Sequence, residues 1–194
     1  MSPEQFPYAH SKVLAEAVVA EAVRAGQDVV TVNPVIVMGP GDLNMISGTY
    51  ITLVKRFGPL VPITSGGIAV IDVRDVARMH LAAAEKGRTG ERYILSTANY
   101  THRQWYGMIA DIVGVRRPFI PTPSFLLPIG AALIDLARRL GINTPIDSNQ
   151  ARLGGRYIYF NPAKAWAELA QPQIDMRQSL QDTYDWYRQH GYIK

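Results

Sequence analysis

The chain has 194 residues, 47% of them hydrophobic, and no cysteine, so it can bury the core of one domain or somewhat more and holds no disulfide or thiolate metal site. Its net charge of +4 comes from scattered basic residues, not from the basic stripe typical of nucleic-acid binding. The most apolar stretch is broken by Pro128 and Asp135 and is too short to span a membrane. We therefore expect a cytoplasmic protein without nucleic-acid or membrane partners, and the separated histidines predict no metal site.

The first expected element is a helix over residues 8–25. At 100° per residue, Glu16, Glu21 and Arg24 fall within one arc of about 140°, and the rest of the surface is nearly all Ala, Val and Leu. Such a helix needs cover on two sides, by a sheet and by something else. Gly26 follows as a typical C-terminal stop.

A short buried strand is expected next, in the β-branched residues 28–34, ending at Pro34. A helix, a short turn and an apolar strand form the second half of a βαβ unit, which predicts a parallel sheet. The turn cluster Gly39 to Asp42 then lies at the carboxyl side of this strand. Ligands bind at that edge of open α/β sheets.

The remaining chain continues the alternation of strands and helices. Further strands are expected at 68–73, 91–97 and 156–160, with a loop at 58–67. Further helices are expected at 48–57, 76–86 and 101–113, and at 162–170 and 176–190. Another is expected before 162–170, ending near Leu140. Asp75 is expected to cap the third helix and Gly87 to end it.

Two strand pairings follow from this order. Residues 29–33 should lie parallel to 92–96, with the helix at 8–25 against one face, because crossovers between parallel strands are right-handed. Residues 69–73 should lie beside 156–160, since both segments are short and rich in β-branched or aromatic residues.

Tyr8 and Lys12 are four residues apart, so they share one helical face. A free tyrosine has a pKa near 10, and an adjacent ammonium together with a helix N-terminus favours its phenolate. Lowering the pKa by about three units needs roughly 4 kcal/mol. The pair could then exchange a proton with a substrate hydroxyl or carbonyl while hydride moves to or from a cofactor. A helix-capping tyrosine beside a lysine with a buried stem would give the same spacing without chemistry.

Longer segments carry a family resemblance. YAHSKVLAE, VVTVNPVIVMGPGD and GGIAVIDVRDVARMHLAAAEKGRTGERYIL, followed by AKAWAEL and SLQDTYDWYRQHGYI, together resemble the extended short-chain dehydrogenase/reductase family, in its NAD-dependent epimerase/dehydratase and dihydroflavonol-reductase-like branch. The resemblance covers nearly the whole chain in order. It implies an α/β fold: an incomplete Rossmann-type parallel sheet (1–37 and 72–100) with a small, mostly helical substrate-binding domain (38–71 and 101–194).

The resemblance also implies roles for individual residues. Tyr8 would be the catalytic acid/base, and Lys12 would bind the cofactor ribose and favour the phenolate. The cofactor, NAD or NADP, would further contact Asn33, Pro34, Val35 and Val37. The substrate would be faced by Asp42, Asn44 and Arg74. Asp42 could equally be a turn residue, and the Arg74 guanidinium suits an ion pair as well as a substrate oxygen.

The chain departs from the family at its start. The GxxGxxG turn that holds the cofactor pyrophosphate is absent from the sequence, as is the serine or threonine expected about two dozen residues before the tyrosine. We therefore expect the C-terminal part of an enzyme of roughly 310 to 330 residues. It would act on a nucleotide-sugar or a hydroxy or keto compound, and would form a homodimer through the helix at 8–25. The alternative is a non-catalytic remnant or interaction module unable to bind the cofactor alone.

Overall fold

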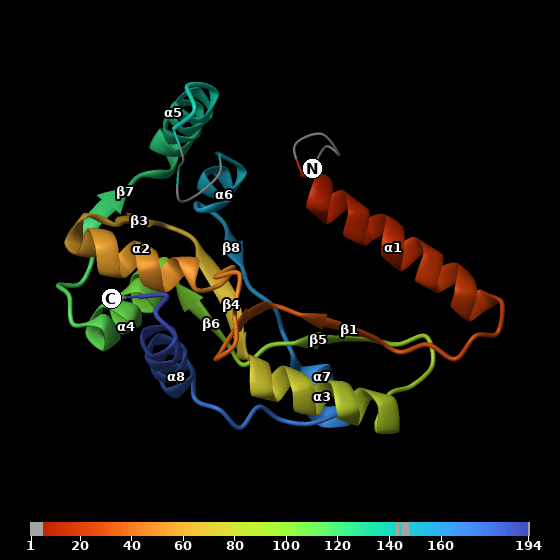
Figure 1. Ribbon diagram of the computed structural model, residues 1–194. Helices are drawn as coiled ribbons and strands as arrows, with labels where there is room; N and C mark the ends of the chain where they lie inside the picture. Colours follow the sequence, from red (N-terminus) through yellow and green to blue (C-terminus); the bar gives the residue numbers. More distant parts are fainter. Residues whose placement is uncertain (1–5, 143, 145–147, 194) are drawn as a thin grey trace.

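A computed structural model describes residues 6–142, 144 and 148–193 of the chain. Figure 1 shows a body of strands and helices from which helix α1 (Pro7–Arg24) stands apart. Gly26 lies just beyond the end of α1 and has a φ of 92°. Glycine adopts such a positive φ without strain because it has no Cβ. The helix prediction for residues 8–25 is thereby confirmed.

Two short strands form the parallel pair that the sequence predicted. Strand β1 (Thr31–Pro34) runs parallel to β5 (Arg92–Leu95), with Thr31 opposite Arg92. Helices α3 (Val73–Lys86) and α7 (Ala163–Glu168) share a buried cluster with this pair, through Met79, Tyr93, Leu95 and Ala165. The predicted cover by α1 is met only in part, since no side chain of α1 is buried.

A second sheet separates the two cores of the molecule. Strand β4 (Gly67–Asp72) pairs in parallel with β2 (Ile36–Met38) and in antiparallel with β6 (Ala98–Thr101). All six β4 residues are buried. Its side chains alternate between faces, so that Ile68 and Val70 belong to one buried cluster and Ile71 to the other.

Three helices build the larger core against this sheet: α2 (Thr49–Phe57), α4 (His102–Val113) and α8 (Met176–Gln189). Trp105, Leu180 and Tyr187 are fully buried among them. A reciprocal capping box between Thr101 and Gln104 fixes the start of α4, satisfying two backbone donors at once. The predicted helices at 48–57, 101–113 and 176–190 are confirmed within one or two residues.

The segment expected as a loop at 58–67 is more ordered than predicted. It contains a 3₁₀ turn at Gly58–Leu60 and strand β3 (Pro62–Thr64), which pairs in parallel with β7 (Ile120–Thr122). A second 3₁₀ turn, Ser124–Leu126, leads into α5 (Leu127–Arg139), which packs on α6 (Ser148–Leu153). The pairing of β3 with β7 supplies hydrogen-bond partners for the backbone of 62–64, which composition alone did not predict.

The predicted cap of α3 is wrong by three residues. Asp72, the last residue of β4, is the N-cap, and its carboxylate accepts the backbone N–H of Arg74 at 2.7 Å. Asp75 lies inside the helix, fully buried, and accepts the N–H groups of Gln173 and Ile174 at 3.0 Å each. It ties α3 to the chain before α8. Gly87 ends the helix as predicted.

The pairing predicted between 69–73 and 156–160 is wrong for the first segment, since the β4 residues that pair with β8 come before residue 69. Strand β8 (Tyr157–Ile158) runs parallel to β4 with Gly67 opposite Tyr157 and Ile68 opposite Ile158. The second segment therefore pairs with β4, but at the two residues before the predicted stretch. Only two residues of the second segment form a strand, because β2 pairs with the rest of that edge of β4, from Val70 to Asp72.

Candidate active site

Tyr8 and Lys12 lie on the first two turns of α1, which begins at Pro7, a residue suited to the first helical position. The Nζ atom of Lys12 lies 5.3 Å from the centre of the Tyr8 ring, and Tyr8 is 75% exposed. An ammonium at this distance is attracted by the ring face. The structure therefore keeps together the two side chains that the sequence paired.

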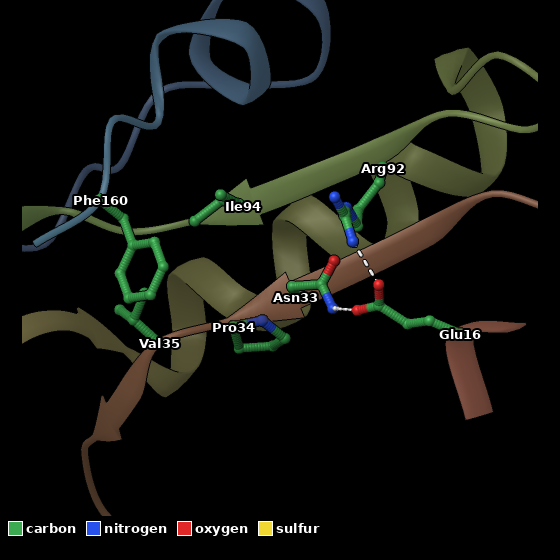
Figure 2. A pocket seen from close by; sticks show the side chains of 7 residues that line it. All are labelled: Glu16, Asn33, Pro34, Val35, Arg92, Ile94 and Phe160. Carbon is green, nitrogen blue, oxygen red and sulfur yellow. Dashed lines mark hydrogen bonds and ion pairs between the residues drawn. The ribbon is translucent and has the colours of Figure 1, made fainter. Parts of the chain in front are cut away.

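Glu16, one helical turn beyond Lys12, connects α1 to the parallel strands. Figure 2 shows Asn33 and Arg92 both directed at this carboxylate. The Asn33 Nδ2 group donates to Glu16 Oε1 at 3.1 Å, and the Arg92 guanidinium binds the other oxygen. Tyr8, Lys12 and Glu16 are spaced by four residues and share one face, so this contact turns the Tyr8–Lys12 face toward β1.

A small cavity of about 350 Å³ lies at this contact, lined by Glu16, Asn33, Pro34, Val35, Arg92, Ile94 and Phe160. The Oδ1 atom of Asn33 is buried and has no hydrogen-bond partner among the described residues. A buried carbonyl oxygen without a donor is uncommon and often marks a place for a ligand or water. Three of the predicted cofactor residues, Asn33, Pro34 and Val35, therefore meet at one cavity.

A larger cavity, of about 1220 Å³, brings together Tyr8, Val35, Val37 and Asp42. We refer to it as the large cavity. Val35 lines both cavities, so they adjoin at the carboxyl end of β1. The turn from Gly39 to Asp42 follows β2 and also contributes to the lining, as the position of ligand sites in open α/β sheets predicts.

Asp42 has a clear structural task in this lining. Its Oδ1 accepts the backbone N–H of Ile46, and its Oδ2 accepts those of Ser47 and Gly48, each at 3.0 Å. The Tyr187 hydroxyl donates to Oδ2 at 3.0 Å as well. The carboxylate thus holds the turn that leads into α2, which supports the interpretation of Asp42 as a turn residue. Its side chain nevertheless lies at the cavity wall.

Three predicted residues are absent from the lining of both cavities. Lys12 lies beside Tyr8 but is not among the lining residues, and Asn44 is exposed on the turn before α2. Arg74 pairs with Asp72 at 2.9 Å and with Asp182 at 2.8 Å. Burial would raise the pKa of Asp72, but the hydrogen bonds from Arg74 outweigh it and hold that pKa below its usual value. The guanidinium is therefore engaged in ion pairs.

A polar pair that the sequence did not single out lies in the large cavity. His102 Nδ1 and Thr64 Oγ1 are 2.6 Å apart, and the Thr64 hydroxyl also donates to the Gly154 carbonyl. His102 is 94% buried, its exposed fraction being 6%, and its ring stacks on Tyr106 with centroids 5.8 Å apart. Burial lowers the pKa of His102. Because the two residues are 38 positions apart, no local pattern could have paired them.

Two other classes of site are absent from the part of the chain that the structure describes. There, no cluster of three or more His, Cys, Asp and Glu side chains could hold a metal ion. No described helix is both long and apolar enough to cross a membrane.

Comparisons with known proteins add to this geometry. Residues 2–96 match the NAD dependent epimerase/dehydratase family. A dihydroflavonol 4-reductase-like protein of Synechocystis sp. is 32% identical over 193 residues, which is 96% of this chain and 56% of that protein.

Solved structures resemble the chain as well. The crystal structure of gox2253 superposes with a TM-score of 0.79 at 29% identity and covers all of this chain. PA4631, a nucleoside-diphosphate-sugar epimerase from Pseudomonas aeruginosa, gives a TM-score of 0.71 at 28% identity over 94% of this chain. The chain spans 60% and 55% of these two proteins, so their resemblance concerns little more than half of each.

Proposed function

We propose that this chain, whose residues 2–96 match the NAD dependent epimerase/dehydratase family, carries the acid–base pair and substrate cavity of an NAD(P)-dependent oxidoreductase or a related epimerase or dehydratase. One observation supports this most directly. Tyr8 lines the large cavity together with the chain segment that follows β1, so a substrate held there can meet the phenol.

The proposed chemistry divides between cofactor and protein. A bound nicotinamide supplies or accepts hydride. Tyr8 handles the proton: its phenolate takes the proton of a substrate hydroxyl as the carbonyl forms, and its phenol returns that proton in the reverse direction. Lys12, 5.3 Å from the ring centre, offers N–H donors toward a ribose. Glu16 holds the helix by which both are presented.

The residues present fit the nicotinamide end of such a cofactor. The unpaired Oδ1 of Asn33 is the kind of acceptor that a carboxamide N–H requires, and the backbone from Pro34 to Val37 lies beside it along the two cavities. No GxxGxxG turn for the pyrophosphate occurs in the 194 residues. NAD and NADP share this nicotinamide end, so these residues fit either cofactor.

A cofactor titration tests this assignment. The 194-residue chain should bind NADH and NADPH only in the millimolar range or more weakly, because it lacks the charge-assisted contacts to the pyrophosphate, each of which contributes about 1.5 to 3 kcal/mol. Fluorescence of the reduced nicotinamide measures this directly. Micromolar binding would mean that we have misplaced the cofactor site.

Substitutions at the acid–base pair test the chemistry. In the longest polypeptide that the gene encodes, Tyr8→Phe should abolish turnover and leave cofactor affinity nearly unchanged, whereas Lys12→Ala should reduce both. Arg74→Gln serves as the control, because Arg74 forms an ion pair with Asp182 and takes no part in the proposed proton transfer. Full turnover by the Tyr8→Phe enzyme would remove Tyr8 from the mechanism.

A second function is favoured by the surface of α1. Val13, Leu14 and Val18 are between 54% and 65% exposed, and an apolar patch of this kind is typical of an interaction surface. The chain could therefore act as an interaction module without bound cofactor, or pair with a second copy through residues 8–25. Analytical ultracentrifugation of the chain and of a Leu14→Lys variant would distinguish a self-associating surface from one reserved for another partner.

A further inference from the structure

The walls of the large cavity are predominantly apolar. Ile36, Leu53, Phe57, Leu60, Leu127 and Ile134 contribute from four different parts of the fold. At about 1220 Å³ the cavity exceeds the few hundred to about 1,000 Å³ usual for small-molecule sites. Its size therefore admits a compound of several fused rings or a long hydrocarbon body.

The cavity lacks the means to neutralise a charged ligand. None of its described lining residues is a lysine, an arginine or a glutamate, and its one carboxylate belongs to Asp42. A nucleoside diphosphate would bring two negative charges, which proteins meet with Arg, Lys or free helix N-termini. Burying phosphates here without such partners would carry a large desolvation penalty.

The start of α2, which follows Asp42, does not offer a free anion site. The backbone N–H groups of Ser47 and Gly48 are taken by the Asp42 carboxylate, and that of Thr49 by the Met45 carbonyl. A carboxylate already occupies the position where a phosphate would sit. Charge at this wall opposes an anionic substrate.

The polar pair His102–Thr64 gives the cavity a defined hydrogen-bonding character. A carbonyl oxygen can only accept, so the Thr64 hydroxyl hydrogen points to Gly154 and Thr64 Oγ1 accepts from His102 Nδ1–H. The neutral imidazole then carries its proton on Nδ1 and presents Nε2 as an acceptor. Burial, which lowers the pKa of His102, keeps the ring in this neutral form at pH 7.

We propose that the large cavity takes an uncharged, largely hydrocarbon hydroxy or keto compound whose second polar group is a hydroxyl that donates to His102 Nε2. The proposal rests on the proposed function for the position of the reacting group at Tyr8. It selects, between the two substrate classes open above, the hydroxy or keto compound over the nucleotide-sugar. His102 would act as a specificity residue by orienting the substrate between its two polar ends.

Binding measured without cofactor tests the substrate class. Isothermal titration calorimetry of the 194-residue chain would compare three probes: dihydrotestosterone, the same steroid ketone lacking its ring-D hydroxyl, and UDP-glucose. We expect both ketones to bind, the hydroxylated one about five-fold more tightly because of one additional hydrogen bond, and UDP-glucose not to bind at millimolar concentration. UDP-glucose binding more tightly than the ketones, or no binding of either ketone, would overturn the proposal.

Substitutions at His102 test its role. In His102→Asn the amide nitrogen can replace Nδ1 as the donor to Thr64, but no acceptor remains at the Nε2 position, so the five-fold preference should disappear while the ketone itself still binds. His102→Gln, whose longer amide reaches the Nε2 position, should restore part of the preference. His80→Asn is the matched control, since His80 is exposed on α3 and outside the cavity lining. A preference that persists in His102→Asn would exclude His102.

The design separates this proposal from the proposed function. None of the titrations requires hydride transfer, so an inactive chain that binds the ketones as expected still supports the substrate class. Tight binding of UDP-glucose would reject the substrate class and leave the Tyr8–Lys12 chemistry untouched. If His102→Asn fails to fold, as judged by circular dichroism, the three-probe comparison on the unaltered chain still decides the matter.

Discussion

Replacing Asp42 with alanine should loosen the turn that leads into α2. The Oδ1 atom of Asp42 accepts one backbone N–H, from Ile46, and Oδ2 accepts two, from Ser47 and Gly48, all at 3.0 Å. Tyr187 adds its hydroxyl from α8 at 3.0 Å. One side chain thus holds the start of a helix and a residue of the larger core.

The magnitude follows from these four bonds. A hydrogen bond to a charged acceptor contributes about 1.5 to 3 kcal/mol when shielded from water. The bond to Ile46 is exposed and counts for little, whereas those to Ser47 and Gly48 are partly buried. Taking the lower end for these two, Asp42→Ala should lower the free energy of unfolding by about 3 kcal/mol.

Two matched variants sharpen the expectation. An asparagine can place its amide oxygen at the Oδ2 position and keep the two partly buried bonds, but with a neutral acceptor, so Asp42→Asn should cost about 1 kcal/mol. Tyr187→Phe, which removes one hydroxyl from the same carboxylate, should cost about as much. Urea unfolding followed by circular dichroism measures all three. If Asp42→Ala unfolds within about 1 kcal/mol of the unaltered chain, the carboxylate does not hold the turn, and its role toward a ligand gains weight.

Three further outcomes follow from other contacts. Glu16→Gln should speed amide exchange in α1 while changing stability by less than about 1 kcal/mol, because the contact is exposed; unchanged exchange would contradict the anchoring role. Gly48→Ala should destabilise strongly in urea unfolding, since a Cβ there would overlap Tyr187, whereas Gly130→Ala, with open space around it, should gain about 0.5 to 1 kcal/mol. The lowered pKa of Asp72 predicts a contribution that is complete at neutral pH and lost as pH falls below about 4, and Asp72→Asn should flatten that part of an unfolding profile.

The elements predicted correctly are those with strong local signals. Helix α1 has a proline at its first position and Gly26 beyond its end, and α4 carries its own capping box at Thr101. The pairing of β1 with β5 follows from handedness and needs no detail of the side chains. In each case the information lies within a few residues, or in a topological rule that holds for most folds.

The elements that the sequence did not predict depend on partners that are distant in the chain. Strands β2, β6 and β7 are three or four residues long, too short for an alternation to be recognised, and each exists because another strand completes its hydrogen bonds. The cap of α3 shows the same limit. Asp72 and Asp75 are both suitable residues, and only the end of β4 decides between them.

The candidate site divides in the same way. The spacing of Tyr8 and Lys12 is visible in the sequence, and the structure places Tyr8 at the large cavity. Thr64 and His102 were not identified, because their pairing depends on β3 lying beside the start of α4. Glu16 was assigned to a polar arc, and a helical wheel cannot tell a solvated carboxylate from one that binds Asn33.

The two faces of α1 do not compete for partners. Leu14 and Val18 lie about 160° and about 120° around the helix axis from Lys12, the middle residue of the line of Tyr8, Lys12 and Glu16, and both are exposed. The contacts of Glu16 are worth little in water, whereas covering the apolar side chains would stabilise the helix by roughly 1.5 to 3 kcal/mol for each residue fully buried. A partner on the apolar face would therefore fix the helix far more firmly than Glu16 does. Because that partner would approach from the opposite side, it would hold Tyr8 at the large cavity without blocking it.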